Sequence, residues 1–567
     1  MPNVVSFAGM LVLIFLAWTL SEDRRRFPWR VVTWGLALQV LFGFLVLRWE
    51  PGAQFFLGLN DVFSALLAFS REGAVFVFNS VGSAAEDGST PPTLKEYLTR
   101  LGAESADPVI RAAVRNGTVP GFFFAFQVLT TIIFFSALLS VLYYLGVMQK
   151  VVLLFARIMA RTMGVSGAES LANSANIFVG QTEAPLVVRP YIERMTRSEL
   201  MAIMVGGFAN TAGGVLGAYV LMLVGFFPNI ASHLIAASVL SAPAAFIFAK
   251  VLVPEKDVPL TKGEVRMEVE IEDANIIDAA SNGTTIGWQL AINVGAMLVS
   301  FVALVALLNL MVSWFGGFFR GPSGVLVFDL MAVAAFAGLF WLERREAPDD
   351  TSLWALFFGV VGAWVGLRML GQPSLARSVA LVGLAGWLPL FLQSGRPRKF
   401  GRWGWGSVAV IAVAANLAFV AFGPLGDGTQ LSLQLLLGWL HWPIALVMGV
   451  PPQDCLAVGK ILGNKLILTE FVAYLDLSNL LAAAARGEVP PLDPRSVVIV
   501  SYALCGFANV ASIGIQIGGI APIAPSRRHD VARLGLKAMF GGALATFMIA
   551  CVAGMFYRPG MLGLVGR

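Results

Sequence analysis

Two short segments far apart in the sequence carry the same polar residues at the same spacing. Residues 207–213 read GFANTAG and residues 506–512 read GFANVAS. Each follows an interrupted apolar segment with a lone glutamate, Glu183 in SANIFVGQTEAPL and Glu470 in GNKLILTEFVAYLDL. A carboxylate accepts hydrogen bonds from hydroxyl groups, and an asparagine both donates and accepts. Because no histidine lies beside either glutamate, these residues suit the binding of a polar solute or ion better than catalysis.

Both glutamates lie in strongly apolar sequence. A carboxylate near the centre of a bilayer costs several kcal/mol unless it is paired, hydrated or used in function. The alternative is that each lies at an interface and pairs with a neighbour, such as Arg189 or Lys465. For Glu183 alone the two interpretations have equal weight. Two glutamates at matched positions of a repeat favour a functional role.

The composition places these segments in a membrane protein. Of the 567 residues, 57% are hydrophobic and 13% are charged, and the mean hydropathy is +0.78. Soluble proteins carry about 25% charged residues, and the apolar runs reach the roughly 20 residues that a spanning helix needs. The sequence therefore predicts an all-α polytopic membrane protein. The net charge of +5 reflects loop arginines rather than a nucleic-acid surface, and no nucleic acid is expected as a partner.

The first apolar stretch, residues 4–20, has no basic residue before it and is followed by arginines at 24, 25, 26 and 30. A signal peptide has the reverse arrangement. We therefore expect a permanent first span, with the amino terminus outside and the arginines in the cytoplasm.

Two regions interrupt the pattern of spans. Residues 83–120 form a polar insert that we expect outside the membrane. Four additional apolar runs lie between residues 324 and 422, and the loops between them alternate between basic and non-basic. An even number of added spans leaves the orientation of the following segments unchanged.

The two copies of the repeat are expected to have opposite orientations, because the chain crosses the membrane an odd number of times between them. Inverted repeats with broken helices at the midplane recur in secondary transporters. Backbone groups exposed by such a break are tolerated where they line a cavity. The sequence thus predicts a secondary transporter with a solute site at the repeat interface.

Long motifs surround both copies. They read GQTEAPLVVRPYIERMTRSEL (180–200), GGFANTAGGVLGAYV (206–220), PPQDCLAVGKILGNKLILTEFVAYLDL (451–477) and SYALCGFANVASIGIQIGGIAPIAPSRRHD (501–530). In these motifs the sequence resembles the concentrative nucleoside transporter family. The resemblance implies inverted repeats with two re-entrant helical hairpins and two unwound transmembrane helices. It also implies a homotrimer in the bacterial inner (plasma) membrane, whose transport domains move against a scaffold in an elevator-like cycle.

The resemblance also implies a substrate site and a sodium site. The substrate residues would be Gln181, Thr182 and Glu183 at the nucleobase, Glu470, Asn509 and Ser512 at the ribose hydroxyls, and Val215 and Phe507 as apolar walls. The sodium residues would be Asn176, Val179, Asn210 and Thr211, which offer the oxygen donors that a hard cation prefers. No other cofactor is implied.

Domain boundaries follow from the same comparison with the family. The expected segments are scaffold spans with an interfacial helix at 1–82, the polar periplasmic insert at 83–120, a scaffold span with an amphipathic helix at 121–163, transport-domain repeat 1 at 164–253, a cytoplasmic loop at 254–285, a scaffold span at 286–315, inserted spans at 316–428 and transport-domain repeat 2 at 429–567.

Several alternatives remain at this point. The symporter could be coupled to protons, with Glu183 or Glu470 as the proton carrier. A polytopic membrane enzyme acting on a lipid or nucleotide would need a nucleophile or a metal constellation, which the motifs lack. A receptor or channel is disfavoured because alternating hairpins suit occlusion. The three cysteines lie in apolar sequence with no CxxC pair, so neither a disulfide framework nor a zinc site is predicted.

Overall fold

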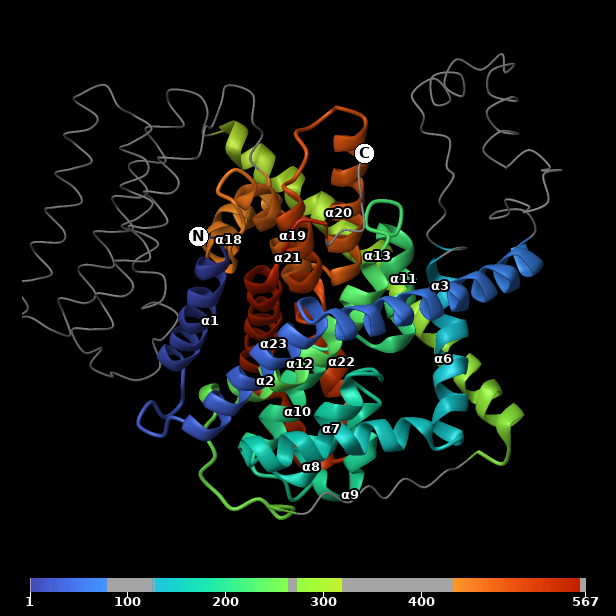
Figure 1. Cartoon of the computed structure of the whole chain (residues 1–567), viewed down its shortest axis with the longest axis vertical. Helices are drawn as coiled ribbons and strands as arrows, with labels where there is room; N and C mark the ends of the chain where they lie inside the picture. Colours follow the sequence, from blue (N-terminus) through green and yellow to red (C-terminus); the bar gives the residue numbers. More distant parts are fainter. Residues whose placement is uncertain (1, 79–124, 126–127, 264–272, 319–431, 561–567) are drawn as a thin grey trace, which may run out of the picture. The chain divides into compact units, whose positions relative to one another are not determined.

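The computed structural model describes residues 2–78, 125, 128–263, 273–318 and 432–560, which are helical and contain no strand (Figure 1). This confirms the all-α prediction for the described residues. The chain divides into two compact units, residues 1–302 with 444–567 and residues 303–443. The polar insert at 83–120 and the four predicted apolar runs lie outside the described residues.

The helices are numbered in chain order, with gaps where residues are not described. They are α1 (Pro2–Thr19), α2 (Trp29–Leu47), α3 (Glu50–Phe78), α6 (Leu129–Tyr144), α7 (Val147–Met163), α8 (Gly167–Asn176), the 3₁₀ helix η2 (Ala184–Val188), α9 (Arg189–Ile192), α10 (Arg197–Ala209), α11 (Gly213–Leu223), α12 (Ile230–Leu252), α13 (Ile276–Phe318), α18 (Leu433–Met448), α19 (Cys455–Ile467), α20 (Glu470–Ala485), α21 (Pro494–Leu504), α22 (Val510–Ile520), η3 (Pro525–Arg527) and α23 (Arg528–Phe556).

The candidate residues all belong to the first unit, where α23 is the central helix. It packs against α1, α10, α12, α21 and α22, so the last helix of the chain contacts elements of both repeats. The side chains of α23 are buried over most of its length. Of the second unit, the structure describes the end of α13 and the beginning of α18, where the Leu433 N–H donates to Asn309 Oδ1 at 2.8 Å.

Two helices that carry candidate residues begin with the same capping arrangement. At the start of α8, Ser166 Oγ accepts from the Glu169 N–H, and the Glu169 carboxylate accepts from the Ser166 N–H. At the start of α10, Thr196 and Glu199 form the same reciprocal pair. A Ser or Thr followed three residues later by Glu satisfies two backbone donors that the first turn leaves free. The sequence therefore fixes where both helices begin.

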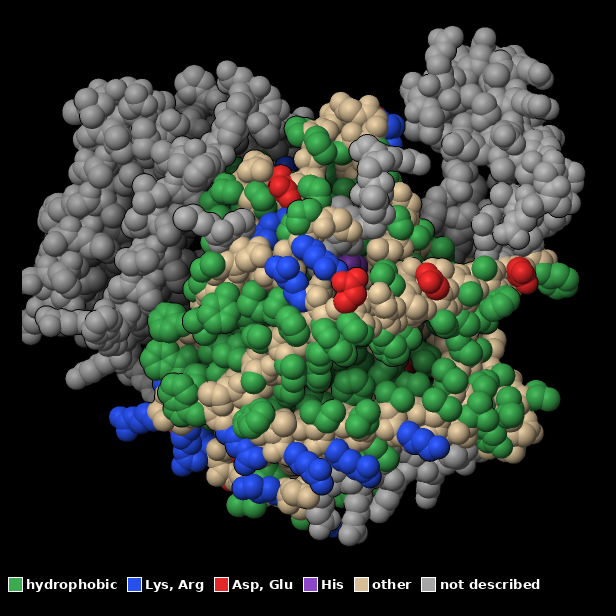
Figure 2. Space-filling model, viewed as in Figure 1, with side chains coloured by type: hydrophobic (Ala, Val, Ile, Leu, Met, Phe, Trp, Pro, Cys, Tyr) green, Lys and Arg blue, Asp and Glu red, His purple; other side chains and the backbone are tan. Residues whose placement is uncertain are grey.

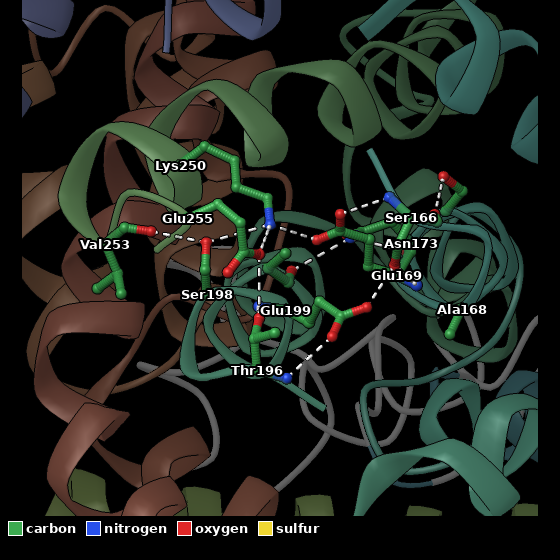
Figure 3. A network of polar contacts seen from close by, with 12 residues as sticks. Ser166, Ala168, Glu169, Asn173, Thr196, Ser198, Glu199, Lys250, Val253 and Glu255 are labelled. Carbon is green, nitrogen blue, oxygen red and sulfur yellow. Dashed lines mark hydrogen bonds and ion pairs between the residues drawn. The ribbon is translucent and has the colours of Figure 1, made fainter. Parts of the chain in front are cut away.

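A polar network joins these two helix starts to the end of α12 (Figure 3). Ser166 Oγ donates to Glu199 Oε1 at 2.5 Å. Lys250, which is 4% exposed, lies 2.7 Å from Glu169 Oε2 and 3.2 Å from Glu255 Oε2. Because the lysine contacts carboxylates from two segments, it fixes α8 and the segment after α12 relative to each other. The opposite ends of α8 and α10 carry the candidate sodium residues.

The helices have the length and composition of membrane spans. Among the described residues, six helical stretches can cross a membrane, and a seventh results if α6 and α7, which are bent by 80°, count as one span. On the face drawn in Figure 2, a broad band of hydrophobic side chains lies above a row of Lys and Arg side chains. Arg24, Arg25 and Arg26 are exposed in the turn between α1 and α2.

Candidate functional site

The chain leaves helical geometry at both copies of the GFAN motif. Between α10 and α11, Asn210 (φ −98°, ψ 154°) and Ala212 (φ −62°, ψ 134°) are extended. Between α21 and α22, Cys505 (φ −55°, ψ 140°) and Asn509 (φ −139°, ψ 163°) leave the helix in the same way. We call residues 210–212 the first break and residues 505–509 the second break. Extended backbone frees amide and carbonyl groups from intrahelical hydrogen bonds.

The two breaks are in direct contact. The Gly506 N–H donates to Thr211 Oγ1 at 2.9 Å. A β-carbon at Gly506 would lie 2.5 Å from the Ala209 carbonyl oxygen, and Gly506 has a φ of +90°. Only glycine combines this close approach with a positive φ at low cost. The repeated glycine thus allows the two copies to meet backbone to backbone.

Glu470 is buried where the two repeats meet. Its side chain is 2% exposed. Oε1 accepts from the Tyr219 hydroxyl at 3.0 Å, and Oε2 accepts from Asn509 Nδ2 at 2.9 Å. Asn509 in turn caps α22, because its Oδ1 accepts from the Ser512 N–H at 2.9 Å. The structure therefore brings Glu470, Asn509 and Ser512 together.

Aromatic packing holds the Tyr219 hydroxyl in place. The Tyr219 ring stacks on Tyr474, with centroids 4.4 Å apart, and meets the edge of Phe471 at 4.9 Å. Tyr219 comes from α11 of the first repeat, and its two neighbours come from α20 of the second. Sequence analysis missed Tyr219, although it lies in the quoted motif GGFANTAGGVLGAYV, because a tyrosine in an apolar run usually reads as packing.

Gln181 and Thr182 lie against α22 and the end of α10. A β-carbon at Gly207 would lie 2.4 Å from Gln516 Nε2 and 3.0 Å from the Gln181 β-carbon. A β-carbon at Gly519 would lie 2.7 Å from Thr182 Cγ2. Helix α22 thus carries Asn509 at its cap and contacts Thr182 near its other end. Residues of both repeats therefore line the same helix.

Three buried acceptor atoms in this region have no hydrogen-bond partner among the described residues: Gln181 Oε1, Glu183 Oε2 and Gln516 Oε1. An unpartnered buried acceptor costs about 1–3 kcal/mol, which a polar solute would offset. Gln516 was missed by sequence analysis. It follows Ser512 by four residues on α22, and this spacing on one helical face was the available signal.

The two residues expected as apolar walls lie on different elements. Val215 is buried in the first turns of α11. Phe507 is half-buried within the second break, where its carbonyl accepts from the Asn509 N–H at 2.8 Å.

The four expected sodium residues lie around the first break and the turn after α8. The Gly213 N–H donates to the Phe178 carbonyl at 2.9 Å, which joins this turn to the start of α11. The Asn176 side chain fits its surroundings when its oxygen faces the Gly207 N–H and its nitrogen faces the Gly180 carbonyl, each at 3.3 Å. Val179 follows in the same turn.

The other two sodium candidates belong to the first break itself. Asn210 Nδ2 donates to the Gly206 carbonyl at 3.1 Å, and its Oδ1 accepts from Ser241 Oγ of α12. Thr211 is the residue that accepts from Gly506. The side-chain and carbonyl oxygens around this break are neutral and suit a hard monovalent cation.

Three family models match the chain. The model described as "Na+ dependent nucleoside transporter C-terminus" matches residues 233–350 and 406–554, and the corresponding N-terminus model matches residues 8–81. A model described as "Nucleoside recognition" matches residues 125–227. Together these regions include both breaks and every candidate site residue.

Relatives match along nearly the whole chain. An uncharacterized transporter of Haemophilus influenzae is 34% identical over 565 residues, which are 100% of this chain and 100% of that protein. Sodium/nucleoside cotransporter 1 of Mus musculus is 32% identical over 565 residues, which are 98% of this chain and 64% of the mouse protein. The chain thus spans less than two thirds of the mammalian relative.

Solved structures of similar proteins extend the comparison. CNTnw in an inward-facing substrate-bound state is 33% identical, with a TM-score of 0.66 over 98% of each chain. A doubly substituted CNTnw in an outward-facing state gives a TM-score of 0.69. These matches point to a transporter family rather than to a membrane enzyme. This multi-pass membrane protein belongs to the concentrative nucleoside transporter family.

Proposed function

We propose that this chain imports nucleosides by symport with sodium. The observation that best supports this is the Glu470 carboxylate, which is buried and held by two neutral donors, Tyr219 and Asn509. An ionised carboxylate offers about four acceptor positions. Two of them are used, so Glu470 retains the capacity to accept from the 2′ and 3′ hydroxyls of a ribose. Asn509 and Ser512 would complete the contacts with the sugar.

The nucleobase would lie against the other group of residues. Gln181, Thr182 and Glu183 offer an amide, a hydroxyl and a carboxylate, which answer the mixed donors and acceptors of a base edge. The free acceptors Gln181 Oε1 and Glu183 Oε2 support this assignment. Val215 and Phe507 would contact the apolar faces of the nucleoside.

Sodium would bind between the turn after α8 and the first break. Asn176, Val179, Asn210 and Thr211 would supply the oxygen donors. Coupling requires that sodium and nucleoside each bind more tightly when the other is present, because the coupling free energy is reciprocal. The contact between Thr211 and Gly506 supports such coupling, since it joins the proposed sodium residues to the break that carries Asn509.

The transport cycle would be elevator-like, with the two repeats moving together. In this proposal, α8 with η2 and α9 and α19 with α20 are the re-entrant hairpins, and α10–α11 and α21–α22 are the unwound transmembrane helices. The transport domain would comprise residues 164–253 and 429–567. Residues 1–82, 121–163 and 286–315 would form the scaffold of a homotrimer.

The protein would lie in a bacterial plasma membrane with its amino terminus outside. Exposed arginines in the turn between α1 and α2 support this orientation, because Lys and Arg are enriched in cytoplasmic loops. The bacterial relatives support the location.

The experiment that tests the proposal is uptake of radiolabelled uridine and adenosine into proteoliposomes, with an inward gradient of sodium or of choline at fixed pH. We expect accumulation with sodium and none with choline. Accumulation that survives in choline and follows a pH gradient would support the proton-coupled alternative. Failure to take up any nucleoside under either gradient would contradict the substrate class.

A further inference from the structure

Lys465 is buried against the end of α21, where the second break begins. Its side chain is 2% exposed. Its Nζ lies 2.7 Å from the Ala503 carbonyl oxygen, 3.0 Å from the Cys505 carbonyl oxygen and 3.0 Å from Thr546 Oγ1 on α23. All three neighbours are uncharged oxygens. Such a set of oxygens at the carboxyl end of a broken helix is the kind of environment that binds a sodium ion in transporters.

The geometry indicates that Lys465 is an ammonium group. Each of its three neighbours accepts, since two are carbonyl oxygens and the third, Thr546 Oγ1, donates its own proton to the Ala543 carbonyl at 2.9 Å. A charged lysine has three N–H donors and no acceptor. A neutral amine would direct its lone pair at one of the three oxygens. The positive end of the side chain also faces the negative end of the α21 dipole.

In the first repeat, the two corresponding carbonyl groups have different hydrogen-bond donors. Ala503 and Cys505 precede the glycine of GFANVAS by three residues and by one, as Met204 and Gly206 precede the glycine of GFANTAG. The Met204 carbonyl accepts from Gln516 Nε2 at 3.0 Å, and the Gly206 carbonyl accepts from Asn210 Nδ2 at 3.1 Å. Neutral amides thus satisfy, in the first repeat, the carbonyls that a cation satisfies in the second.

The sequence before each break shows the same difference. Asn176 in the first hairpin segment is followed by Ile177, whereas Asn464 in the second is followed by Lys465. The repeat that would bind sodium has an apolar residue at this position. In the second repeat, the Lys465 side chain itself supplies a positive charge.

We propose that the Lys465 ammonium is a tethered cation that joins the second hairpin segment to the second break, as sodium would join the first hairpin segment to the first break, so that sodium binding is confined to the first repeat. Its three hydrogen bonds stabilise the extended backbone that presents Phe507 and Asn509 to the substrate. Lys465 is therefore a positioning residue whose charge is essential. This inference rests on the proposed sodium coupling.

The test compares Lys465→Gln and Lys465→Met with the unmodified chain in reconstituted uptake, with sodium varied against choline. Glutamine is the neutral donor that the first repeat uses on Met204, so it keeps hydrogen bonds and removes the charge. We expect both variants to lose at least about 10-fold in uptake at low sodium. In Lys465→Met, which leaves the three oxygens without a donor, we also expect recovery at high sodium, with the Hill coefficient for sodium rising from about one to about two as a second ion fills the vacated site.

The charge moved per nucleoside, measured as current against tracer uptake, should rise by one in Lys465→Met. The double variant Lys250→Met with Glu169→Gln is the matched control, because it removes another buried lysine together with its partner. It should keep a Hill coefficient of about one.

Two results would overturn the tethered cation. One is wild-type uptake and sodium dependence in Lys465→Gln, which would leave the lysine a purely hydrogen-bonding role. The other is loss of folded protein in both variants in high sodium and in choline alike, since solution sodium would then be unable to replace the ammonium. Uptake by the unmodified chain distinguishes failure of this inference from failure of the proposed sodium coupling. If the unmodified chain takes up nucleoside equally in sodium and in choline, the proposed coupling itself is wrong.

Discussion

Two lysines in the described ranges are buried, and their surroundings are opposite in kind. Lys250 lies beside the starts of α8 and α10 and contacts the carboxylates of Glu169 and Glu255. Lys465 lies at the end of α21 and donates to three uncharged oxygens. A buried pair of opposite charges fixes structure and leaves little net charge. The Lys465 charge has no carboxylate among its hydrogen-bond partners but interacts electrostatically with Glu470. Charged groups buried in membrane proteins are usually functional.

The starts of α8 and α10 differ in the same way from the breaks in the chain. At the starts of α8 and α10, the Glu169 and Glu199 carboxylates complete capping boxes, and Lys250 forms an ion pair with Glu169. At the breaks, neutral amides, hydroxyls and carbonyls make the contacts, apart from those of Lys465 and Glu470. The first region is built to stay fixed, whereas the second retains unused acceptors that a solute or an ion can satisfy.

The largest effect on stability should come from Lys250→Met. This variant leaves Glu169 buried without its partner, and breaking a buried pair in this way costs about 3–5 kcal/mol. We expect a pronounced fall in the Tm of the detergent-purified protein. Adding Glu169→Gln should recover most of the loss. A double variant no more stable than the single one would contradict the pairing.

Gly506→Ala should disrupt the contact between the breaks. The new β-carbon would meet the Ala209 carbonyl oxygen at 2.5 Å, and the positive φ alone costs about 1–3 kcal/mol. We expect loss of uptake with reduced thermal stability. Gly514→Ala on α22 is the control, because no atom lies within 4 Å of its added β-carbon. Equal behaviour of the two variants would show that the close approach is unimportant.

Glu470→Gln should weaken nucleoside binding strongly without preventing expression. The amide keeps the shape of the side chain but loses the charge, and a hydrogen bond to a charged group is worth about 1.5–3 kcal/mol. We therefore expect KM for uridine to rise about 10- to 100-fold. The measurement is initial uptake rate against uridine concentration. Near-normal transport would remove Glu470 from the site.

The smallest effect should come from Ser241→Ala, which removes the donor to Asn210 Oδ1. A neutral hydrogen bond contributes about 0.5–1.5 kcal/mol. We expect the sodium concentration for half-maximal uptake to shift a few-fold, with the Hill coefficient unchanged. This result would distinguish the first break from the surroundings of Lys465. Ser241→Ala would alter the affinity for one sodium ion, whereas Lys465→Met would alter the number of sodium ions bound. An unchanged sodium dependence would place Asn210 outside the ion site.

Much of the site could be predicted from the sequence because the repeat marks it twice. The polar residues of GFAN stand out against apolar surroundings, and Glu470 and Asn509 come into hydrogen-bond contact in the structure. The helix starts at Ser166 and Thr196 follow from local capping patterns. The caps depend on residues close together in the chain, and the repeat marks Glu470 and Asn509 by residue type, so sequence patterns record both features well.

What could not be predicted depends on partners from distant segments. Lys465 was considered as an ion-pair partner of Glu470, yet its three hydrogen bonds go to α21 and α23. Tyr219 and Gln516 look like ordinary helix residues until α20 and α10 are placed beside them. The four-residue spacing from Ser512 places Gln516 on the same helical face, but it does not indicate the contact with α10. The described residues leave the proposed domain boundaries and the roles of the inserts as predictions.

The three cysteines of the chain, Cys455, Cys505 and Cys551, are all buried. Cys505 belongs to the second break, and its sulfur lies 3.5 Å from the Tyr474 hydroxyl. The native chain therefore carries a thiol within the second break, where a chemical reagent can test the proposed transport cycle. The rate at which a small thiol reagent modifies Cys505 would measure how often the second break becomes accessible to the reagent. A slower rate in the presence of sodium or nucleoside would show that the ligand favours the closed break, without any engineered label.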